Sequence, residues 1–171
     1  MKIVLIGYMG SGKSTVGRVL SEKMGLLFVD LDEAIEEGEG KTIAALFKER
    51  GQITFRKIEH RYLTSILREN DNLVLATGGG APCYSGNMQT ILNATDHVFY
   101  LKLSINGLVE RLAPQKSNRP LIAHVTKEEM PEFFGKHLFE RNTFYNQANY
   151  TIVCDGKSVD DIAGEIEGKL V

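Results

Sequence analysis

The residues with the most specific chemical pattern occupy the stretch Gly7–Thr15, which reads GYMGSGKST. They fill the pattern G-x-x-x-x-G-K-[ST], in which glycines let backbone amides turn inward around a polyphosphate. Lys13 supplies a positive charge for the β- and γ-phosphates, and the hydroxyl of Ser14 can ligate Mg²⁺. A glycine-rich turn that binds nothing is the alternative, but four specified positions seldom match by chance in a chain of 171 residues. We therefore predict a nucleotide-binding loop.

Two carboxylates, Asp30 and Asp32, follow the apolar run Leu26–Val29. If the backbone is extended at this point, side chains two residues apart point to the same side. One carboxylate could then hold a water molecule bound to Mg²⁺, while the other accepts the proton of a substrate hydroxyl. Asp32 could instead serve only as the N-cap of a helix that starts at Glu33. Because the phosphate loop is expected one strand away, we favour binding of metal and substrate.

Arg56 and Glu59 are three residues apart in a predicted helix, which places them on one face where they can pair. An arginine whose rotamer is held by a glutamate could bind a substrate carboxylate through two parallel hydrogen bonds. An exposed salt bridge has the same spacing, is common and contributes little to stability. From spacing alone, the exposed salt bridge is the favoured interpretation.

Gly78, Gly79 and Gly80 follow the third apolar run of the chain. Three consecutive glycines do not serve the stability of a strand or a helix, because each one costs conformational entropy on folding. At the end of a strand they let a ligand approach the backbone closely and they offer amide donors. A tight turn is the alternative, although a turn seldom needs three glycines. We predict a segment that contacts a ligand.

Two arginines further along the chain could bind anions. Arg119 lies in the stretch 113–127, which has the periodicity of neither a helix nor a strand. An irregular stretch of this length is usually a lid or a disordered segment, and a lid arginine could neutralise charge on a transferring phosphate. Arg141, on a later predicted helix, could be a second anion ligand. Taken singly, each arginine is more often a solvated surface residue.

The elements that must position these residues alternate between strands and helices. Short apolar runs predict strands at residues 3–6, 26–29, 73–76, 97–101 and 150–153. Helices are predicted at residues 15–24, 33–37, 42–50 with Gly51 as its stop, a longer stretch around 58–67, 86–92, 104–112, 128–147 and 159–170. This order predicts an α/β fold with a five-stranded parallel sheet and helices on both faces. In such sheets the ligand lies beyond the carboxyl ends of the strands.

The composition narrows the functional class. The length fits a single domain over residues 1–171, with a lid at about 113–127. A net charge of -2 provides no general attraction to nucleic acid or to a membrane surface, and we expect neither partner. The two cysteines and four histidines show no disulfide or metal-ligand spacing. The chain offers no signal peptide or membrane span, so we expect a cytoplasmic protein, and a monomer because nothing demands an oligomer.

Taken together, these motifs resemble those of the shikimate kinase family, in the same order and over nearly the whole chain. The matching segments are Gly7–Thr15, Asp30–Asp32, Phe55–Glu59, Gly78–Gly80, Arg119–Leu121 and Arg141. The resemblance implies a three-layer P-loop NTPase fold, similar to that of nucleoside-monophosphate kinases. It also implies transfer of the γ-phosphoryl group of ATP to the 3-hydroxyl of shikimate, a step toward chorismate and the aromatic amino acids.

The resemblance implies roles for individual residues on the nucleotide side. The implied ATP-binding residues are Gly10, Ser11, Gly12, Lys13, Ser14, Thr15, Arg111 and Arg119. Arg111 would lie over the adenine, and Gly156–Ser158 would lie near its other side. Ser14 and Asp30 would place Mg²⁺, directly or through water.

On the acceptor side, the implied shikimate-binding residues are Asp32, Arg56, Gly78, Gly79, Gly80 and Arg141. Asp32 would hold the reacting hydroxyl as the candidate base, and the two arginines would grip the carboxylate. Lys13, Asp32 and Arg119 would be the catalytic residues. One departure from the family pattern is Ala81-Pro82 after the glycines, where the family often continues with an aliphatic residue. It leaves the conformation of this turn open.

Two other functions remain possible at this point. A related small-metabolite kinase, acting on another polyol acid such as gluconate, would share the phosphate loop and the lid. The combination of F-R-x-x-E with three glycines argues against it. A nucleotide-dependent module without catalysis would not need the carboxylate on the substrate side.

Overall fold

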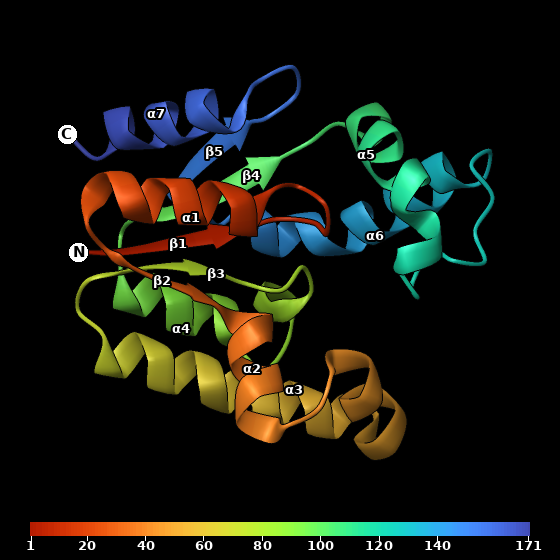
Figure 1. Ribbon diagram of the computed structural model, residues 1–171, viewed down its shortest axis with the longest axis horizontal. Helices are drawn as coiled ribbons and strands as arrows, with labels where there is room; N and C mark the ends of the chain where they lie inside the picture. Colours follow the sequence, from red (N-terminus) through yellow and green to blue (C-terminus); the bar gives the residue numbers. More distant parts are fainter.

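The computed structural model describes residues 1–171 as a five-stranded parallel sheet with helices packed around it (Figure 1). The strands are β1 (Lys2–Ile6), β2 (Leu27–Asp30), β3 (Leu73–Ala76), β4 (Val98–Lys102) and β5 (Tyr150–Val153). The α-helices are α1 (Lys13–Met24), α2 (Leu31–Glu39), α3 (Ile43–Glu69), α4 (Asn87–Ala94), α5 (Ile105–Leu112), α6 (Met130–Tyr145) and α7 (Val159–Lys169). Two 3₁₀-helices are η1 (Ala81–Cys83) and η2 (Ala113–Asn118).

The strand order β2-β3-β1-β4-β5 places β1 in the middle of the sheet. All four strand pairs are parallel, so the carboxyl ends of all five strands lie at one edge. The segments that follow β1, β2 and β3 therefore meet in space, although long stretches of sequence separate them. The predicted α/β class and the predicted parallel sheet are confirmed.

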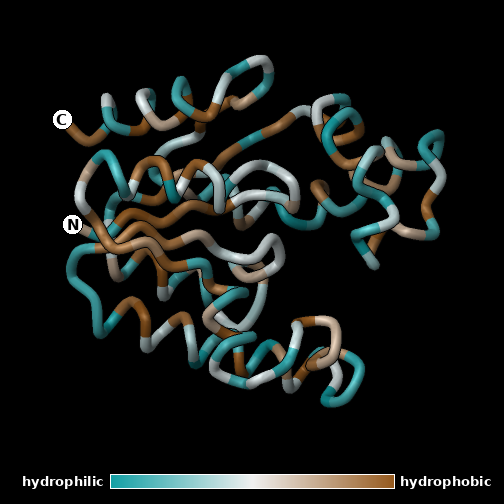
Figure 2. Tube along the Cα trace, viewed as in Figure 1, coloured by the Kyte–Doolittle hydropathy of each residue, from teal (hydrophilic) through white to brown (hydrophobic).

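The core lies between the sheet and the helices. The inner strands are buried along their whole apolar length, for example at Ile3–Ile6 and Leu73–Leu75. Figure 2 shows this as brown along the central strands, with hydrophilic residues gathered on the outer helices and loops. Helices α1 and α7 pack together on one face, and α3, α4 and α6 cover the other (Figure 1). None of the helices is both long and apolar enough to cross a membrane.

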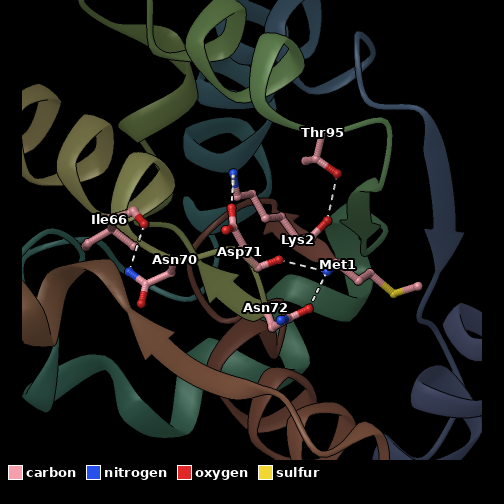
Figure 3. A network of polar contacts seen from close by, with 7 residues as sticks. All are labelled: Met1, Lys2, Ile66, Asn70, Asp71, Asn72 and Thr95. Carbon is pink, nitrogen blue, oxygen red and sulfur yellow. Dashed lines mark hydrogen bonds and ion pairs between the residues drawn. The ribbon is translucent and has the colours of Figure 1, made fainter.

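Polar contacts hold β1 at the amino ends of the strands (Figure 3). The α-amino group of Met1 donates to the carbonyl oxygen of Asp71 at 2.7 Å and to Oδ1 of Asn72 at 2.6 Å. The hydroxyl of Thr95 donates to the carbonyl oxygen of Lys2 at 2.7 Å. These bonds connect β1 to the segments that lead into β3 and β4, and so maintain their register at this end of the sheet.

Several helix boundaries differ from the predictions. The first helix begins at Lys13 rather than Thr15, directly after Gly12. The stop predicted at Gly51 is confirmed, because α3 consists of two helical stretches that meet at a kink there, where φ is 78° and ψ is 170°, a backbone conformation suited to glycine. Helix α6 begins at Met130 rather than Glu128, because turns precede it.

The stretch 113–127 has more structure than its sequence indicated. Its first part, Ala113–Asn118, forms the 3₁₀-helix η2, and turns follow. Ile122 and Val125 are buried and belong to the hydrophobic core. As predicted, this stretch contains neither an α-helix nor a β-strand, although two apolar side chains anchor its turns.

Candidate active site

A cavity of about 550 Å³ opens where the segments after β1, β2 and β3 meet. It is lined by Met9, Gly10, Gly12, Lys13, Ser14, Thr15, Asp30, Asp32, Thr77, Gly78, Gly79, Arg111, Gln115, Arg119 and Val159. The cavity thus brings together most of the predicted nucleotide residues, both aspartates and two of the three glycines. A second hollow, of about 610 Å³, lies along α6 around Phe139 and contains none of the predicted residues.

Lys13 is held by the backbone of the phosphate loop itself. Its Nζ donates to the carbonyl oxygens of Gly7 at 2.8 Å and Tyr8 at 2.9 Å, and the residue is 8% exposed. Burial lowers the pKa of Lys13 to about 8, against the opposing attraction of Asp32 and Asp30. The ammonium group lies against the loop at the amino end of α1. The helix amides at this end also favour binding of an anion.

The loop's conformation depends on glycine. Gly10 has φ 77° and Gly12 has φ 95°, both in the left-handed region that side chains disfavour. A Cβ on Gly10 would also lie 2.6 Å from the side chain of Leu112. Ser11 does not line the cavity, and its buried hydroxyl has no hydrogen-bond partner.

Asp30 and Ser14 form a pair of oxygen ligands at the cavity wall. Asp30 is the N-cap of α2 and accepts a bond from the amide of Glu33 at 3.1 Å, while the hydroxyl of Ser14 donates to its other oxygen. No group of three or more His, Cys, Asp or Glu side chains could hold a metal by itself. Mg²⁺ usually binds proteins through one or two side chains, with phosphates and water completing its shell. The pair fits that mode.

Only the first of the two aspartates lies on extended backbone, so the condition for both side chains to point to one side is not met. Asp30 is the last residue of β2 and has φ -97° and ψ 122°. Helix α2 begins at Leu31, so the N-cap is Asp30 and not Asp32, and Asp32 lies in the first helical turn. The alternative in which Asp32 is the N-cap is therefore wrong. Both carboxylates nevertheless line the cavity, since the helix turns Asp32 back toward the phosphate loop.

The pKa of Asp32 is raised above the usual value of an aspartate. Burial raises its pKa to about 6, the negative charges of Asp30 and Glu59 add to the increase, and Lys13 opposes it. A Cβ on Gly78 would lie 2.9 Å from Oδ1 of Asp32. Gly78 therefore leaves the space in which this carboxylate lies.

Arg56 and Glu59 form a pair in which the glutamate is buried and the arginine half-buried, rather than the exposed salt bridge that spacing favoured. Nη1 of Arg56 lies 2.8 Å from Oε1 of Glu59, and their side chains are 14% and 2% exposed. Burial raises the pKa of Glu59, and Arg56 opposes the increase. The guanidinium approaches the glycines closely, because a Cβ on Gly80 would lie 2.8 Å from its Nη2. Nε of Arg56 is buried without a partner.

Arg141 reaches the same glycines from α6. A Cβ on Gly79 would lie 3.4 Å from Nη1 of Arg141, whose guanidinium carbon is 5.5 Å from the ring centroid of Tyr8. The hydroxyl of Tyr145 donates to the carbonyl oxygen of Gly79 at 2.5 Å. Arg141, Arg56 and Gly80 are not among the lining residues, so they lie beside the cavity at its glycine wall.

Arg111 and Arg119 line the cavity on the nucleotide side. Nη1 of Arg111 donates to the carbonyl oxygen of Gly10 at 3.0 Å. Arg119 donates through Nε and Nη2 to the side chain of Gln115, at 3.1 and 3.0 Å. In place of Gly156–Ser158, the neighbouring Val159 lines the cavity.

Sequence reasoning missed four lining residues: Met9, Thr77, Gln115 and Val159. Thr77 directly precedes the glycines, and Gln115 lies four residues before Arg119, so proximity to known motifs was a usable signal. Tyr145 carried no such signal, because its contact with Gly79 is long-range.

Comparison with known proteins decides the family. The shikimate kinase family model matches residues 9–170. The chain belongs to the shikimate kinase family. A shikimate kinase of Flavobacterium psychrophilum is 44% identical over 166 residues, which cover 96% of each chain. The resemblance drawn from the motifs is thereby confirmed, and with it an ATP-dependent kinase.

Solved structures of the shikimate kinase family share the fold. A crystal structure of shikimate kinase from Bacteroides thetaiotaomicron has a TM-score of 0.92 and 34% identity, covering 99% of this chain and 98% of that one. A shikimate kinase from Acinetobacter baumannii, in complex with shikimate, has a TM-score of 0.88 and 35% identity, covering 99% and 92%. The P-loop NTPase-like architecture is therefore confirmed over the whole chain.

Proposed function

We propose that this protein transfers the γ-phosphoryl group of ATP to the 3-hydroxyl of shikimate, giving shikimate 3-phosphate and ADP. The observation that carries the proposal is that one cavity contains both the phosphate loop and Asp32, a carboxylate with a raised pKa. The pair of Arg56 and Glu59 lies beside that cavity. Family membership supports the same reaction, because relatives over nearly the full chain bear the name shikimate kinase.

On the nucleotide side, the loop Gly10–Thr15 binds the phosphates through its amides and Lys13. Arg111 and Arg119 add positive charge along the same wall. Mg²⁺, held by Ser14 and Asp30 directly or through water, would supply further charge neutralisation when bound. Phosphoryl transfer consists largely of positioning and charge stabilisation, which these groups provide.

On the acceptor side, Arg56 and Arg141 bind the carboxylate of shikimate, and the backbone of Gly78–Gly80 contacts the ring hydroxyls. The 3-hydroxyl oxygen forms the new bond to the γ-phosphorus, and the bond from that phosphorus to the β,γ-bridging oxygen breaks. Asp32 accepts the hydroxyl proton. With its pKa at about 6, Asp32 is ionised at neutral pH and its basicity is raised toward the working pH.

We assign residues 1–171 to one kinase domain and residues 113–127 to a lid that excludes water over the nucleotide. Support comes from Gln115 and Arg119 in the cavity wall and from the buried anchors Ile122 and Val125. Hydrolysis of ATP without shikimate should be far slower than transfer to shikimate. Equal rates would contradict the lid. We further propose a monomer that acts in the cytoplasm, which gel filtration and cell fractionation would check.

A coupled ADP-release assay with shikimate, quinate and gluconate in parallel tests the function. We expect turnover with shikimate to exceed that with the other two acids, because relatives over nearly the full chain bear the name shikimate kinase. All three acids are polyhydroxylated monocarboxylates, so the assay tests a choice that the arginines and the aspartate do not make by themselves. A preference for gluconate would overturn the choice of acceptor. Nucleotide binding without turnover of any acid would indicate a non-catalytic module.

A further inference from the structure

The turn after the three glycines places an aromatic ring against Arg56, the arginine that pairs with Glu59. This is the turn that departs from the family pattern at Ala81-Pro82, and it ends at Tyr84. The guanidinium carbon of Arg56 lies 4.0 Å from the ring centroid of Tyr84. The rings of Phe55 and Phe47 are more distant, at 5.3 and 5.6 Å. Tyr84 therefore covers one face of the guanidinium at the distance of a close cation–π contact.

The position of Tyr84 is set by a buried hydrogen-bond chain that starts on α3. Nδ1 of His60 is 2.7 Å from Oδ1 of Asn87, and Nδ2 of Asn87 donates to the carbonyl oxygen of Ala81 at 2.9 Å. The amide of Asn87 donates to the carbonyl oxygen of Tyr84 at 2.9 Å, and Asn87 is 0% exposed. His60 and Arg56 are four residues apart on α3 and share a helix face. The helix that carries Arg56 thus also anchors the turn that covers it.

The other contacts of Arg56 do not by themselves fix the plane of its guanidinium group. Glu59 bonds only Nη1, the backbone at Gly80 borders Nη2, and Nε has no partner. An arginine pairs with a carboxylate through two parallel bonds, which require the guanidinium plane to face the substrate. A ring whose centroid lies 4.0 Å from the guanidinium carbon leaves that group little room to turn. Glu59 and Gly80 act at the guanidinium edge, so they restrain rotation less directly.

We infer that Tyr84 is a positioning residue that holds the guanidinium plane of Arg56 for the carboxylate of the acceptor, and so contributes to selection of acid substrates. The inference rests on the proposed function. It gives a function to the turn that ends at Tyr84, whose residues take no part in phosphoryl transfer itself. Tyr84 does not itself touch the reacting atoms.

The test compares three variants by steady-state kinetics with shikimate and ATP. Tyr84→Leu keeps apolar volume but removes the ring, and should raise the KM for shikimate about tenfold, the size expected of a desolvated cation–π contact. Its kcat and its KM for ATP should stay within about twofold of wild type. Tyr84→Phe keeps the ring and should retain the wild-type KM. Tyr150→Leu, on β5 and away from the cavity, is the matched control and should leave the KM for shikimate unchanged.

A double-mutant cycle separates this role from a general structural one. In an Arg56→Ala background, Tyr84→Leu should change kcat/KM for shikimate by less than about twofold, because the group that it positions is gone. An equal loss in both backgrounds, or a loss as large with Tyr84→Phe, would overturn the inference. Thermal unfolding of each variant verifies folding, and a folded Tyr84→Leu protein with the wild-type KM would also overturn it.

The two proposals fail in different ways. If the wild-type protein does not phosphorylate shikimate, the proposed function is wrong and the inference falls with it. If the wild-type protein turns over shikimate normally and Tyr84→Leu does not change its KM, only the inference is wrong.

Discussion

The nucleotide half and the acceptor half of the cavity are assembled in different ways. The nucleotide half is built mainly from the continuous loop Gly7–Thr15, in which Lys13 is bonded to carbonyl oxygens five and six residues before it. The acceptor half draws on four separate segments, which carry Asp32, Arg56, the glycines and Arg141. Arg56 pairs with Glu59 on its own helix, and the three glycines leave the space in which the side chains of Asp32, Arg56 and Arg141 lie.

This difference has a consequence for mutational sensitivity. Backbone carbonyls orient Lys13, so few side-chain substitutions outside the loop can displace it. Side chains and glycine contacts orient Arg56, which depends on Glu59, Gly80 and Tyr84. We therefore expect changes in the nucleotide half to affect the chemical step most strongly, and changes in the acceptor half to affect binding of the acid.

The largest effect is expected from Lys13→Ala in the nucleotide half. Loss of a buried ammonium beside the transferring phosphate should lower kcat by about a thousandfold or more, as for other groups that stabilise charge in a transition state. The fold should persist, because removal of Lys13 also removes a buried charge. Single-turnover kinetics and circular dichroism check both parts. Near-normal turnover of a folded variant would contradict the assignment of the phosphate loop.

Arg56→Ala should weaken binding of shikimate in the acceptor half and leave binding of ATP in the nucleotide half nearly unchanged. Loss of a desolvated charged pair with the substrate carboxylate is worth about 2–5 kcal/mol, which corresponds to at least a roughly thirtyfold increase in the KM for shikimate. The KM for ATP should change little. If the KM for shikimate is unchanged, Arg56 does not bind the carboxylate.

The pH dependence separates the two halves through their charged groups. Burial raises the pKa of Asp32 to about 6, and the base must be ionised, so kcat/KM for shikimate should fall about tenfold per pH unit below about 6. Burial lowers the pKa of Lys13 to about 8, so kcat/KM for ATP should fall above about pH 8 as its charge is lost. A flat profile between pH 5 and 7 would rule out Asp32 as the base.

The same carboxylate should also be visible in stability measurements. The folded protein binds the Asp32 proton more tightly than the unfolded chain, so ionisation of Asp32 destabilises the fold as pH rises from about 4 to 6. Asp32→Asn should therefore raise the free energy of unfolding by up to about 3 kcal/mol at pH 7 and by much less near pH 4. Urea unfolding at the two pH values provides this control, and an equal gain at both would contradict it.

The smallest effect is expected from Gly80→Ala. The added Cβ would lie 2.8 Å from Nη2 of Arg56, so the guanidinium must shift and the KM for shikimate should rise about fivefold, the loss expected of one weakened hydrogen bond. Gly164→Ala on α7 is the matched control, because nothing lies within 4 Å of the added Cβ. It should leave the kinetics unchanged and stabilise the helix by about 0.5–1 kcal/mol. Similar kinetics for both variants would contradict the close approach.

The sequence predictions were more accurate for the nucleotide half of the cavity than for the acceptor half. The strand order could not be read directly, but the alternation of apolar runs and helices was enough to predict the parallel sheet. The spacing of Arg56 and Glu59 pointed to a weak surface bridge, since three residues on a helix describe a buried and an exposed pair equally well. The N-cap was assigned to Asp32 as an alternative and belongs to Asp30, because the boundary between β2 and α2 lacks a loop.

The sequence by itself determined the phosphate loop, because every group that shapes it lies within a few residues and its spacing in the chain is its spacing in space. It also determined the family, through motifs that follow one another in order. Only the tertiary structure decided that Arg56 is half-buried beside a buried Glu59, that Asp32 has a raised pKa and that the ring of Tyr84 lies over the guanidinium. Those properties depend on the dielectric environment and on contacts between residues far apart in the chain, which no local pattern contains.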